Sequence, residues 1–224
     1  MATVERTIEI PAGDVRLPAD IVVPAGAGGL VLFAHGSGSG RHSPRNRLVA
    51  TELRDAGLAT ALVDLLTLEE DRVDARTAEL RFDIGLLATR VGVLTAWLVD
   101  HEPTSGLAVG LFGASTGAAA ALVAAAARPD LVAAVVSRGG RPDLAGDALR
   151  SVHQPTLLVV GGRDDLVLEL NRRAQKALAG ESRLDVVPGA SHLFAEPGAL
   201  EAVARLSAEW FVRHLRAAPP PAGG

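Results

Sequence analysis

Cysteine is absent from the 224 residues, and Lys176 is the only lysine. Without cysteine the chain can form no disulfide and no thiolate metal site, and it suits a reducing compartment. The opening segment MATVERTIEI places Glu5 and Arg6 where a secretory signal peptide needs an apolar run. We therefore expect a soluble, cytoplasmic protein with no membrane partner.

An excess of positive charge is absent as well. The formal net charge is −4, and aromatic residues make up 3% of the chain. The basic cluster from Arg41 to Arg47 has no interleaved aromatic residues, so we expect no nucleic-acid partner. No His-Glu-x-x-His motif is present, and the histidines are scattered. We therefore expect neither a metal nor another cofactor.

Apolar segments of strand length alternate with helical patterns along most of the chain, and 48% of the residues are hydrophobic. This alternation predicts an α/β fold: a doubly wound, mainly parallel sheet with antiparallel N-terminal strands and no large lid domain. We expect a single domain over residues 1–216 and a disordered tail at 217–224. Strands are expected at 3–10, 15–23, 29–34, 58–63, 107–112, 131–136, 156–160 and 184–187. Outside the elbow described next, helices are expected at 44–56, 82–99, 143–149, 166–178 and 197–215.

The stretch at 106–127 reads GLAVGLFGASTGAAAALVAAAA. A strand, the turn Gly113-Ala114-Ser115-Thr116-Gly117 and a helix in direct succession predict a nucleophile elbow. Glycine two residues to either side of Ser115 gives the sharp turn the space it needs. The uncharged stretch could also be a membrane span, although the turn divides it into pieces too short to cross. It could equally be a plain buried strand and core helix, with Ser115 as a cap.

Two residues further along could complete a catalytic set with Ser115. A serine hydroxyl needs a general base, and histidine suits this role because its pKa lies near neutrality. His192 follows the last expected strand, and Asp164 follows the strand at 156–160. The carboxyl ends of parallel strands meet at one edge of a sheet, where ligands bind. We therefore expect the three side chains to converge there.

These motifs resemble the α/β-hydrolase superfamily, whose catalytic residues follow the chain order Ser, Asp, His. The resemblance rests on GASTG at 113–117, GGRDDLV at 161–167 and PGASHLF at 188–194. It covers roughly residues 15 to 216, and the compact chain is similar to the dienelactone hydrolase branch. That branch has a cysteine nucleophile where this chain has Ser115, so the resemblance implies a serine esterase and does not carry over the lactone substrate. The family pattern Gly-x-x-Asp-x-x-Val implies Asp164 as the acid and leaves Asp165 as the N-cap of the next helix.

An oxyanion hole needs two N–H donors. We expect one from the backbone of Thr116 and the other from the backbone of Ser37, in the loop after the strand at 29–34. The resemblance implies that His35 shapes this loop and is not the base. Gly36 and Gly38 of the same loop are possible substrate-binding residues.

The glycine-rich loop has a second interpretation. GSGSG before a helix is similar to a dinucleotide fingerprint, and Asp64 ends the next strand where a ribose-binding acid would lie. The spacing is one residue short of G-x-G-x-x-G, and the loop has no Walker lysine. The sequence therefore favours the oxyanion interpretation.

Arginines near the expected site have open roles. Arg138 ends the strand after the elbow and could hold a substrate carboxylate, or it could pair with Asp143, Asp164 or Asp165. Arg41, His42 and Arg45 could face the mouth of the site, or form a solvated helix start.

We therefore predict a serine hydrolase of the carboxylesterase type that cleaves small ester or lactone substrates through an acyl-enzyme. An acyltransferase or perhydrolase on the same triad is an alternative, as is a non-catalytic binding module of the same fold. A homo-oligomer is possible.

Overall fold

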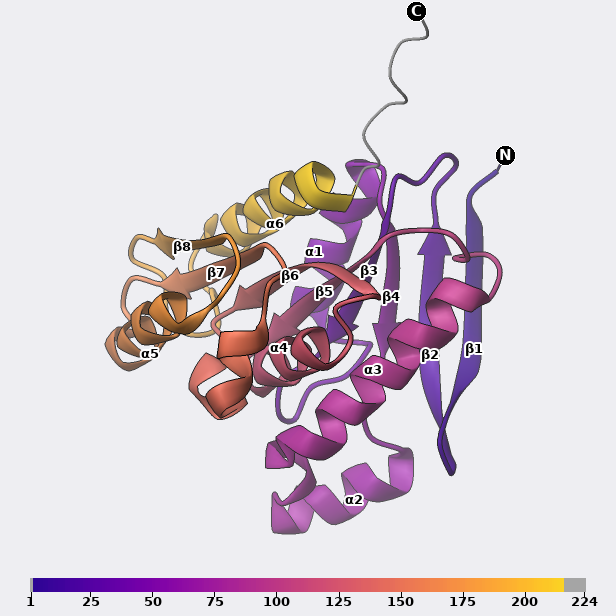
Figure 1. Cartoon of the computed structure of the whole chain (residues 1–224), viewed down its shortest axis with the longest axis horizontal. Coiled ribbons are helices and arrows are strands. Elements are labelled where there is room, and N and C mark those ends of the chain that lie inside the picture. The colour runs from indigo at the N-terminus through magenta and orange to yellow at the C-terminus, as the bar shows by residue number, and fades with distance from the viewer. Residues whose placement is uncertain (1, 216–224) are drawn as a thin grey trace, which may run out of the picture.

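An eight-stranded sheet forms the centre of the protein, with the strand order β1-β2-β4-β3-β5-β6-β7-β8. A computed structural model describes residues 2–215 (Figure 1), and the tail expected at 217–224 lies outside them. The strands are β1 (Val4–Ala12), β2 (Val15–Val23), β3 (Leu30–Ala34), β4 (Ala59–Val63), β5 (Val109–Ala114), β6 (Val132–Arg138), β7 (Thr156–Gly161) and β8 (Ser182–Val187).

Helices connect the strands from β3 onward and cover both faces of the sheet (Figure 1). The α-helices are α1 (Pro44–Asp55), α2 (Leu68–Thr77), α3 (Ile84–Asp100), α4 (Thr116–Ala127), α5 (Asp165–Ala177) and α6 (Ala199–Leu215), and short 3₁₀ segments lie at η1 (Leu80–Phe82) and η2 (Pro142–Ser151). The β1–β2 and β2–β4 pairs are antiparallel, and the remaining pairs from β3 to β8 are parallel. The predicted fold class is therefore confirmed.

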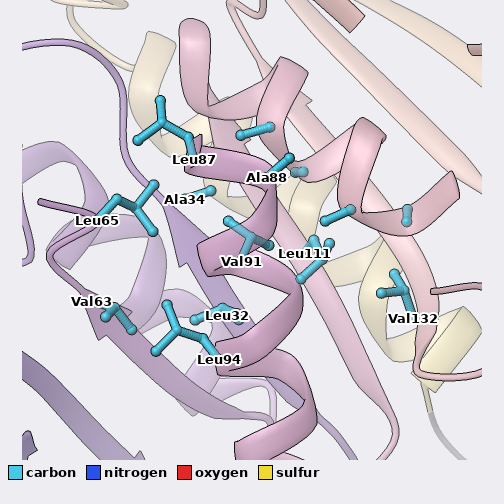
Figure 2. Close-up of a cluster of buried hydrophobic side chains, with 14 of the residues drawn as sticks. Leu32, Ala34, Val63, Leu65, Leu87, Ala88, Val91, Leu94, Leu111 and Val132 are labelled. Atoms are coloured by element: carbon cyan, nitrogen blue, oxygen red, sulfur yellow. The ribbon is translucent and has the colours of Figure 1, made fainter. Parts of the chain in front are cut away.

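Alternating side chains of the central strands form two apolar layers. Leu111 of β5 joins the layer beneath α3 and α4, which Figure 2 shows in close-up. Its neighbour Phe112 points to the other face, where it packs with residues of α1 and α6. Strands that are buried on both faces have uninterrupted apolar sequences, and this is why the positions of the central strands were predictable from the sequence.

Between Thr67 and Ala78, where no helix was expected, the chain folds as α2. Thr67 and Glu70 form a capping box at its start, and Asp74 is its one buried residue. Because α2 buries so little, it lacks the apolar periodicity that marks a helix in a sequence. Two hydrogen bonds from the buried Arg90 of α3 hold Glu70, and they lower the pKa of this carboxyl. This ion pair ties α2 to α3.

The uncharged stretch at 106–127 divides between β5 and α4, as an elbow requires. Across residues 2–215, no helix combines the length and the apolar character that a bilayer-spanning segment needs. The interpretation of this stretch as a membrane span is therefore wrong. In the same part of the chain, no segment forms a separate lid domain.

Candidate active site

Ser115 lies at the tight turn between β5 and α4. Its backbone has φ 51° and ψ −119°, a conformation that is strained for a residue with a side chain. A Cβ on Gly117 would collide with the carbonyl oxygen of Ala34, and one on Gly113 would collide with the backbone of Ala118. Glycine at both positions therefore lets α4 pack closely against the strands and leaves Ser115 at the carboxyl edge of the sheet.

Asp164 and His192 meet at the same edge. Asp164 follows β7 and His192 follows β8, and Nδ1 of the imidazole lies 2.6 Å from Oδ2 of the carboxylate. The carboxylate accepts, so Nδ1 carries the proton and Nε2 is left as the basic nitrogen. The side chain of His192 is 40% exposed and that of Asp164 is 16% exposed, so solvent reaches the imidazole more readily than the carboxylate.

The expected N-cap role of Asp165 is wrong. Asp164 occupies the N-cap position of α5, and its side chain makes no capping hydrogen bond. Its carboxylate binds His192 instead. Asp165 is the first residue of the helix and is exposed, so its charge lies in the first turn, where the helix dipole favours it.

The end of β6 lies close to both Ser115 and His192. The N–H of Ser115 donates to the carbonyl of Arg138 at 3.2 Å. A Cβ built on the next residue, Gly139, would lie 3.6 Å from Cε1 of His192. Within residues 2–215 no direct hydrogen bond joins the hydroxyl of Ser115 to the imidazole. Catalytic contacts are often long in unliganded enzymes and shorten when substrate binds.

A second carboxylate links the loop that carries Asp164 to the loop that carries His192. Glu196 accepts hydrogen bonds from the N–H and the hydroxyl of Ser191, at 2.9 and 3.2 Å. It also lies 3.6 Å from the guanidinium of Arg163, next to Asp164. The N–H of Arg163 donates to the carbonyl of Ala190 at 2.9 Å. Sequence reasoning missed Glu196, because a side chain that bonds its own loop leaves no motif.

Ser37 and Thr116 lie together, as expected for two sides of an oxyanion hole. Their hydroxyl oxygens are 3.0 Å apart, although the residues are 79 positions apart in the chain. Across residues 2–215, neither backbone N–H has a hydrogen-bond acceptor. Both N–H groups are therefore unpaired donors, which the predicted oxyanion hole requires.

His35 supports this loop through both ring nitrogens. Nδ1 donates to the carbonyl of Gly36, and Nε2 accepts from the N–H of Leu65. This pattern requires the neutral imidazole, and burial lowers the pKa of His35. A Cβ on Gly36 would lie 2.9 Å from the carbonyl oxygen of Ala114, so this glycine lets the loop rest on the elbow.

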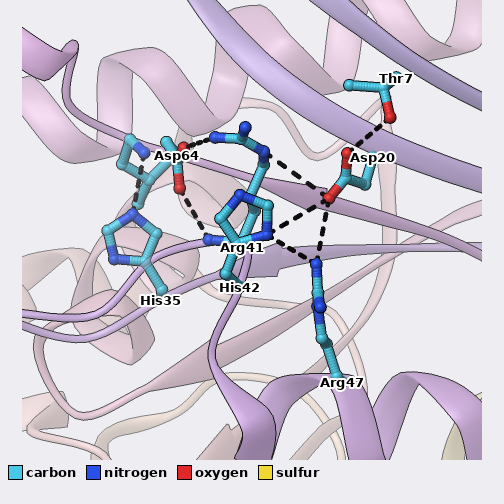
Figure 3. A network of polar contacts seen from close by, with 8 residues as sticks. Thr7, Asp20, His35, Arg41, His42, Arg47 and Asp64 are labelled. Atoms are coloured by element: carbon cyan, nitrogen blue, oxygen red, sulfur yellow. Dashed lines mark hydrogen bonds and ion pairs between the residues drawn. The ribbon is translucent and has the colours of Figure 1, made fainter.

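A network of charges holds the far end of the same loop (Figure 3). The N–H and guanidinium of Arg41 bind the two carboxylate oxygens of Asp64. Arg41 also lies 3.6 Å from Asp20 of β2, which is near His42 and Arg47 as well. Asp64 is therefore engaged within the protein, which argues against a role in ribose binding.

A groove of about 830 Å³ opens beside the oxyanion loop. Its lining includes Gly38, Arg41, Arg45, Leu66 and Leu68. A smaller hollow, lined by Ser37, Gly38 and Thr116, adjoins it and shares Leu66 with it. The groove therefore adjoins the hollow that Ser37 and Thr116 line, and Arg41 and Arg45 are among the residues that line the groove.

Of the two roles left open for Arg138, the ion pair with Asp143, Asp164 or Asp165 is wrong. Asp143 binds Arg141, and Asp164 binds His192. Arg138 is 8% exposed, and its side chain forms no ion pair or hydrogen bond with any residue of the described range 2–215.

The sequence profile of the family described as "Alpha/beta hydrolase domain" matches residues 27–209. The chain belongs to this family. In a comparison with solved structures, this family member superimposes on a dienelactone hydrolase from Anabaena variabilis ATCC 29413 with a TM-score of 0.94. The two sequences are 57% identical, and the match covers 96% of this chain and 100% of the other. The predicted dienelactone hydrolase-like fold is thus confirmed.

More distant solved structures share the fold alone. Est1E from Butyrivibrio proteoclasticus superimposes with a TM-score of 0.77 at 16% identity, over 92% of this chain and 98% of that one. Two curated relatives from Mycobacterium tuberculosis, strains CDC 1551 / Oshkosh and ATCC 25618 / H37Rv, are each named "Putative phosphoribosyl transferase". Each is 57% identical over 98% of this chain but only 48% of its own length. The chain therefore spans about half the length of these relatives.

Proposed function

We propose that the protein is a serine hydrolase that cleaves small carboxylic esters or lactones through an acyl-enzyme intermediate. The observation that carries this proposal is the 2.6 Å contact between His192 and Asp164, at the sheet edge where Ser115 occupies a strained elbow. Membership of the alpha/beta hydrolase family supports it.

In the proposed reaction, the hydroxyl of Ser115 attacks the carbonyl carbon of the ester. Nε2 of His192 accepts the hydroxyl proton, and Asp164 stabilises the imidazolium that forms. The N–H groups of Thr116 and Ser37 bind the oxyanion of the tetrahedral intermediate. The imidazolium then returns its proton to the leaving alcohol, which departs as the acyl-enzyme forms. Water, deprotonated by His192, attacks the acyl carbon and releases the acid and free Ser115.

The open groove favours water as the second nucleophile. The base is 40% exposed, and residues 2–215 contain no lid domain that could keep water from the acyl-enzyme. Acyl transfer to another alcohol or to peroxide needs a site from which water is largely excluded. Hydrolysis is therefore the outcome that we favour. Partitioning of the acyl group between water and added methanol measures this preference directly.

The phosphoribosyl transferase name of the two mycobacterial relatives describes proteins about twice as long as the matched region. We assign that activity to the part of the relatives that this chain does not match, because this chain has an elbow at Ser115 and a paired Asp164 and His192, which suit a hydrolase. A test for phosphoribosyl transfer by this chain is expected to give no activity above background.

A fluorophosphonate probe tests the proposal, because it labels activated serines. We expect labelling at Ser115, located by peptide mass, and hydrolysis of p-nitrophenyl butyrate. Ser115→Ala should lower kcat by about 10⁴-fold or more, and Asp164→Asn by about 10³- to 10⁴-fold.

Asp165→Asn is the matched control, since it removes the same charge from the next residue. It should change kcat by less than about twofold, because Asp165 is exposed and does not contact Ser115 or His192. Labelling at another serine, or equal losses in the two Asp variants, would contradict the assignment.

A further inference from the structure

Strand β8 forms one edge of the sheet, and β1 forms the other (Figure 1). An unpaired strand edge presents N–H and C=O groups to which another strand can bind, and proteins commonly block such an edge with proline and with charged side chains. In β1 the edge is blocked in this way, by Pro11 and by the exposed Glu5, Arg6 and Glu9. In contrast, β8 contains no proline, and within residues 2–215 it pairs only with β7.

Hydrogen bonds at the two ends of β8 show which of its backbone groups face outward. The N–H of Thr156 donates to the carbonyl of Glu181 at 2.9 Å, and the N–H of Gly162 donates to the carbonyl of Val187 at 2.8 Å. The parallel register between these two bonds has no irregularity. Backbone groups alternate in direction along a strand, so the odd-numbered residues of β8 bond to β7. The outward-facing residues are Ser182, Leu184 and Val186.

The side chains of β8 carry one charge of each sign and an exposed apolar group. Arg183 and Asp185 lie two residues apart and therefore on the same face of the strand. Their side chains bind each other, with Nε 3.0 Å from Oδ1 and Nη2 2.6 Å from Oδ2. On the opposite face, Leu184 packs beside residues of α5, and Val186 is 41% exposed. This edge therefore offers free backbone groups, apolar surface and a defined charge pattern.

The charge pattern of β8 is complementary to itself in one antiparallel register. When two copies related by a two-fold axis pair along this edge, the outward-facing residues of one copy lie opposite those of the other. A register centred on Leu184 places Arg183 opposite the second copy's Asp185, twice by symmetry. Centring the pair on either neighbouring residue instead places two like charges directly opposite each other. Opposite charges across paired strands are stabilising and like charges are destabilising, so the charges select the register centred on Leu184.

We propose that two copies of the chain associate through β8, antiparallel and centred on Leu184, so that their sheets form one continuous sheet. Each Arg183 then lies between its own Asp185 and the second copy's Asp185, and Val186 is covered by the second copy's strand. Because the strands are antiparallel, the carboxyl edges of the two sheets face opposite directions, which leaves both grooves open. This inference does not depend on the proposed hydrolase function.

Sedimentation velocity of the full chain, over about 1 to 200 μM, tests this association, because a contact through one strand pair is at the small end of protein interfaces. We expect an equilibrium between one and two copies that shifts toward two as the concentration rises. Asp185→Arg and Arg183→Asp should each raise the dissociation constant about tenfold or more, since each places two pairs of like charges across the interface. A protein that stays monomeric over the whole range would overturn the proposal.

Arg6→Glu is the matched control, because it reverses an exposed charge on the opposite edge strand, β1. It should leave the dissociation constant unchanged. An equal increase in Arg6→Glu would mean that overall charge controls association and would overturn the role of β8. Thermal unfolding followed by circular dichroism shows that each variant is folded before its association is measured.

An equimolar mixture of the two β8 variants tests the register itself. In the register centred on Leu184, both arginines of Asp185→Arg face aspartates of Arg183→Asp, so the mixture should associate about as tightly as the wild-type protein. The Arg183–Asp185 pair within each chain stays broken in both variants, so this recovery reports the contact between chains. A mixture that associates no better than the separate variants would overturn the register, and a dimer that withstands both reversals would place the interface elsewhere.

Discussion

His35 holds the oxyanion loop only while its imidazole is neutral. Nε2 accepts the N–H of Leu65, and Nδ1 donates to Gly36. A proton added to Nε2 would replace this accepted hydrogen bond with two facing donors. The loop that presents Ser37 therefore depends on the protonation state of a residue that takes no part in proton transfer.

We expect the stability of the protein to fall as the pH drops below about 6.5. Burial lowers the folded-state pKa of His35 from its usual 6.5, so in this window the unfolded chain binds a proton that the folded chain does not. The contribution of neutral His35 to the free energy of unfolding is complete above pH 6.5. It decreases as the pH falls, until the pH reaches the lowered folded-state pKa. Urea midpoints at pH 7.5 and 5.5 measure this effect.

His35→Gln should show a smaller pH dependence of stability than the wild-type protein. His214, whose pKa is also lowered by burial, contributes equally to both proteins and cancels from the comparison. His42→Gln, which alters an exposed histidine, should retain the wild-type dependence. Identical pH slopes for His35→Gln and the wild-type protein would exclude the role given to His35.

Local sequence rules predicted which side chains follow the strands at this sheet edge, but not all of their neighbours. Ser115, Asp164 and His192 were predictable because each follows a strand at the same sheet edge, and the glycines around Ser115 mark the turn. Pairing partners were not predictable, because they depend on which side chains meet in space. Asp143, for example, binds Arg141 and not Arg138.

At the scale of elements, two loops must be held together for Asp164 to keep its hydrogen bond with His192. The loop after β7 carries Asp164 and the loop after β8 carries His192. Glu196 bridges them through Ser191 on one side and Arg163 on the other. Hydrogen bonds from Ser191 lower the pKa of Glu196, so the carboxylate stays ionised at neutral pH.

We expect Glu196→Ala to lower kcat about tenfold with little change in KM, because the bridge positions the imidazole and does not contact substrate. Glu196→Gln should retain part of the activity, since its amide oxygen can still accept from Ser191. Steady-state kinetics with p-nitrophenyl butyrate measure both variants, with Glu201→Ala in the first turn of α6 as control. Unchanged kcat in Glu196→Ala would show that the loops hold their positions without the bridge.

The helices were predictable to the extent that they bury an apolar face. Both α3 and α6 contribute many buried residues and were expected close to their observed bounds. By contrast, α2 buries only Asp74 and depends on its capping box and on the Glu70–Arg90 pair. Since Arg90 lies 20 residues from Glu70, no local pattern shows that this segment is stabilised as a helix.

At the scale of the whole molecule, the two tryptophans report on opposite faces of the sheet. Trp97 packs against the apolar layer beneath α3 and α4, and Trp210 lies in the layer between the sheet and α6. The layers share the backbone of the central strands, so we expect neither to unfold without the other.

Single-tryptophan variants test this cooperativity. Trp97→Phe leaves only Trp210 as a fluorescent reporter, and Trp210→Phe leaves only Trp97. In each variant, the urea midpoint from fluorescence should agree with the midpoint from circular dichroism, which follows the whole chain. A fluorescence transition clearly separate from the circular dichroism transition would show that the described residues contain more than one folding unit.

The last turn of α6 packs at the edge of the sheet opposite Ser115. A Cβ on Gly29, just before β3, would lie 2.6 Å from Cβ of Leu215, whereas Ser115 follows the other end of β5. Immobilisation on a solid support through the end of α6 would therefore leave the mouth of the groove facing the bulk solution. Coupling through the neighbourhood of α2, whose residues line the groove, would bring the support close to the mouth and slow the exchange of substrate and product.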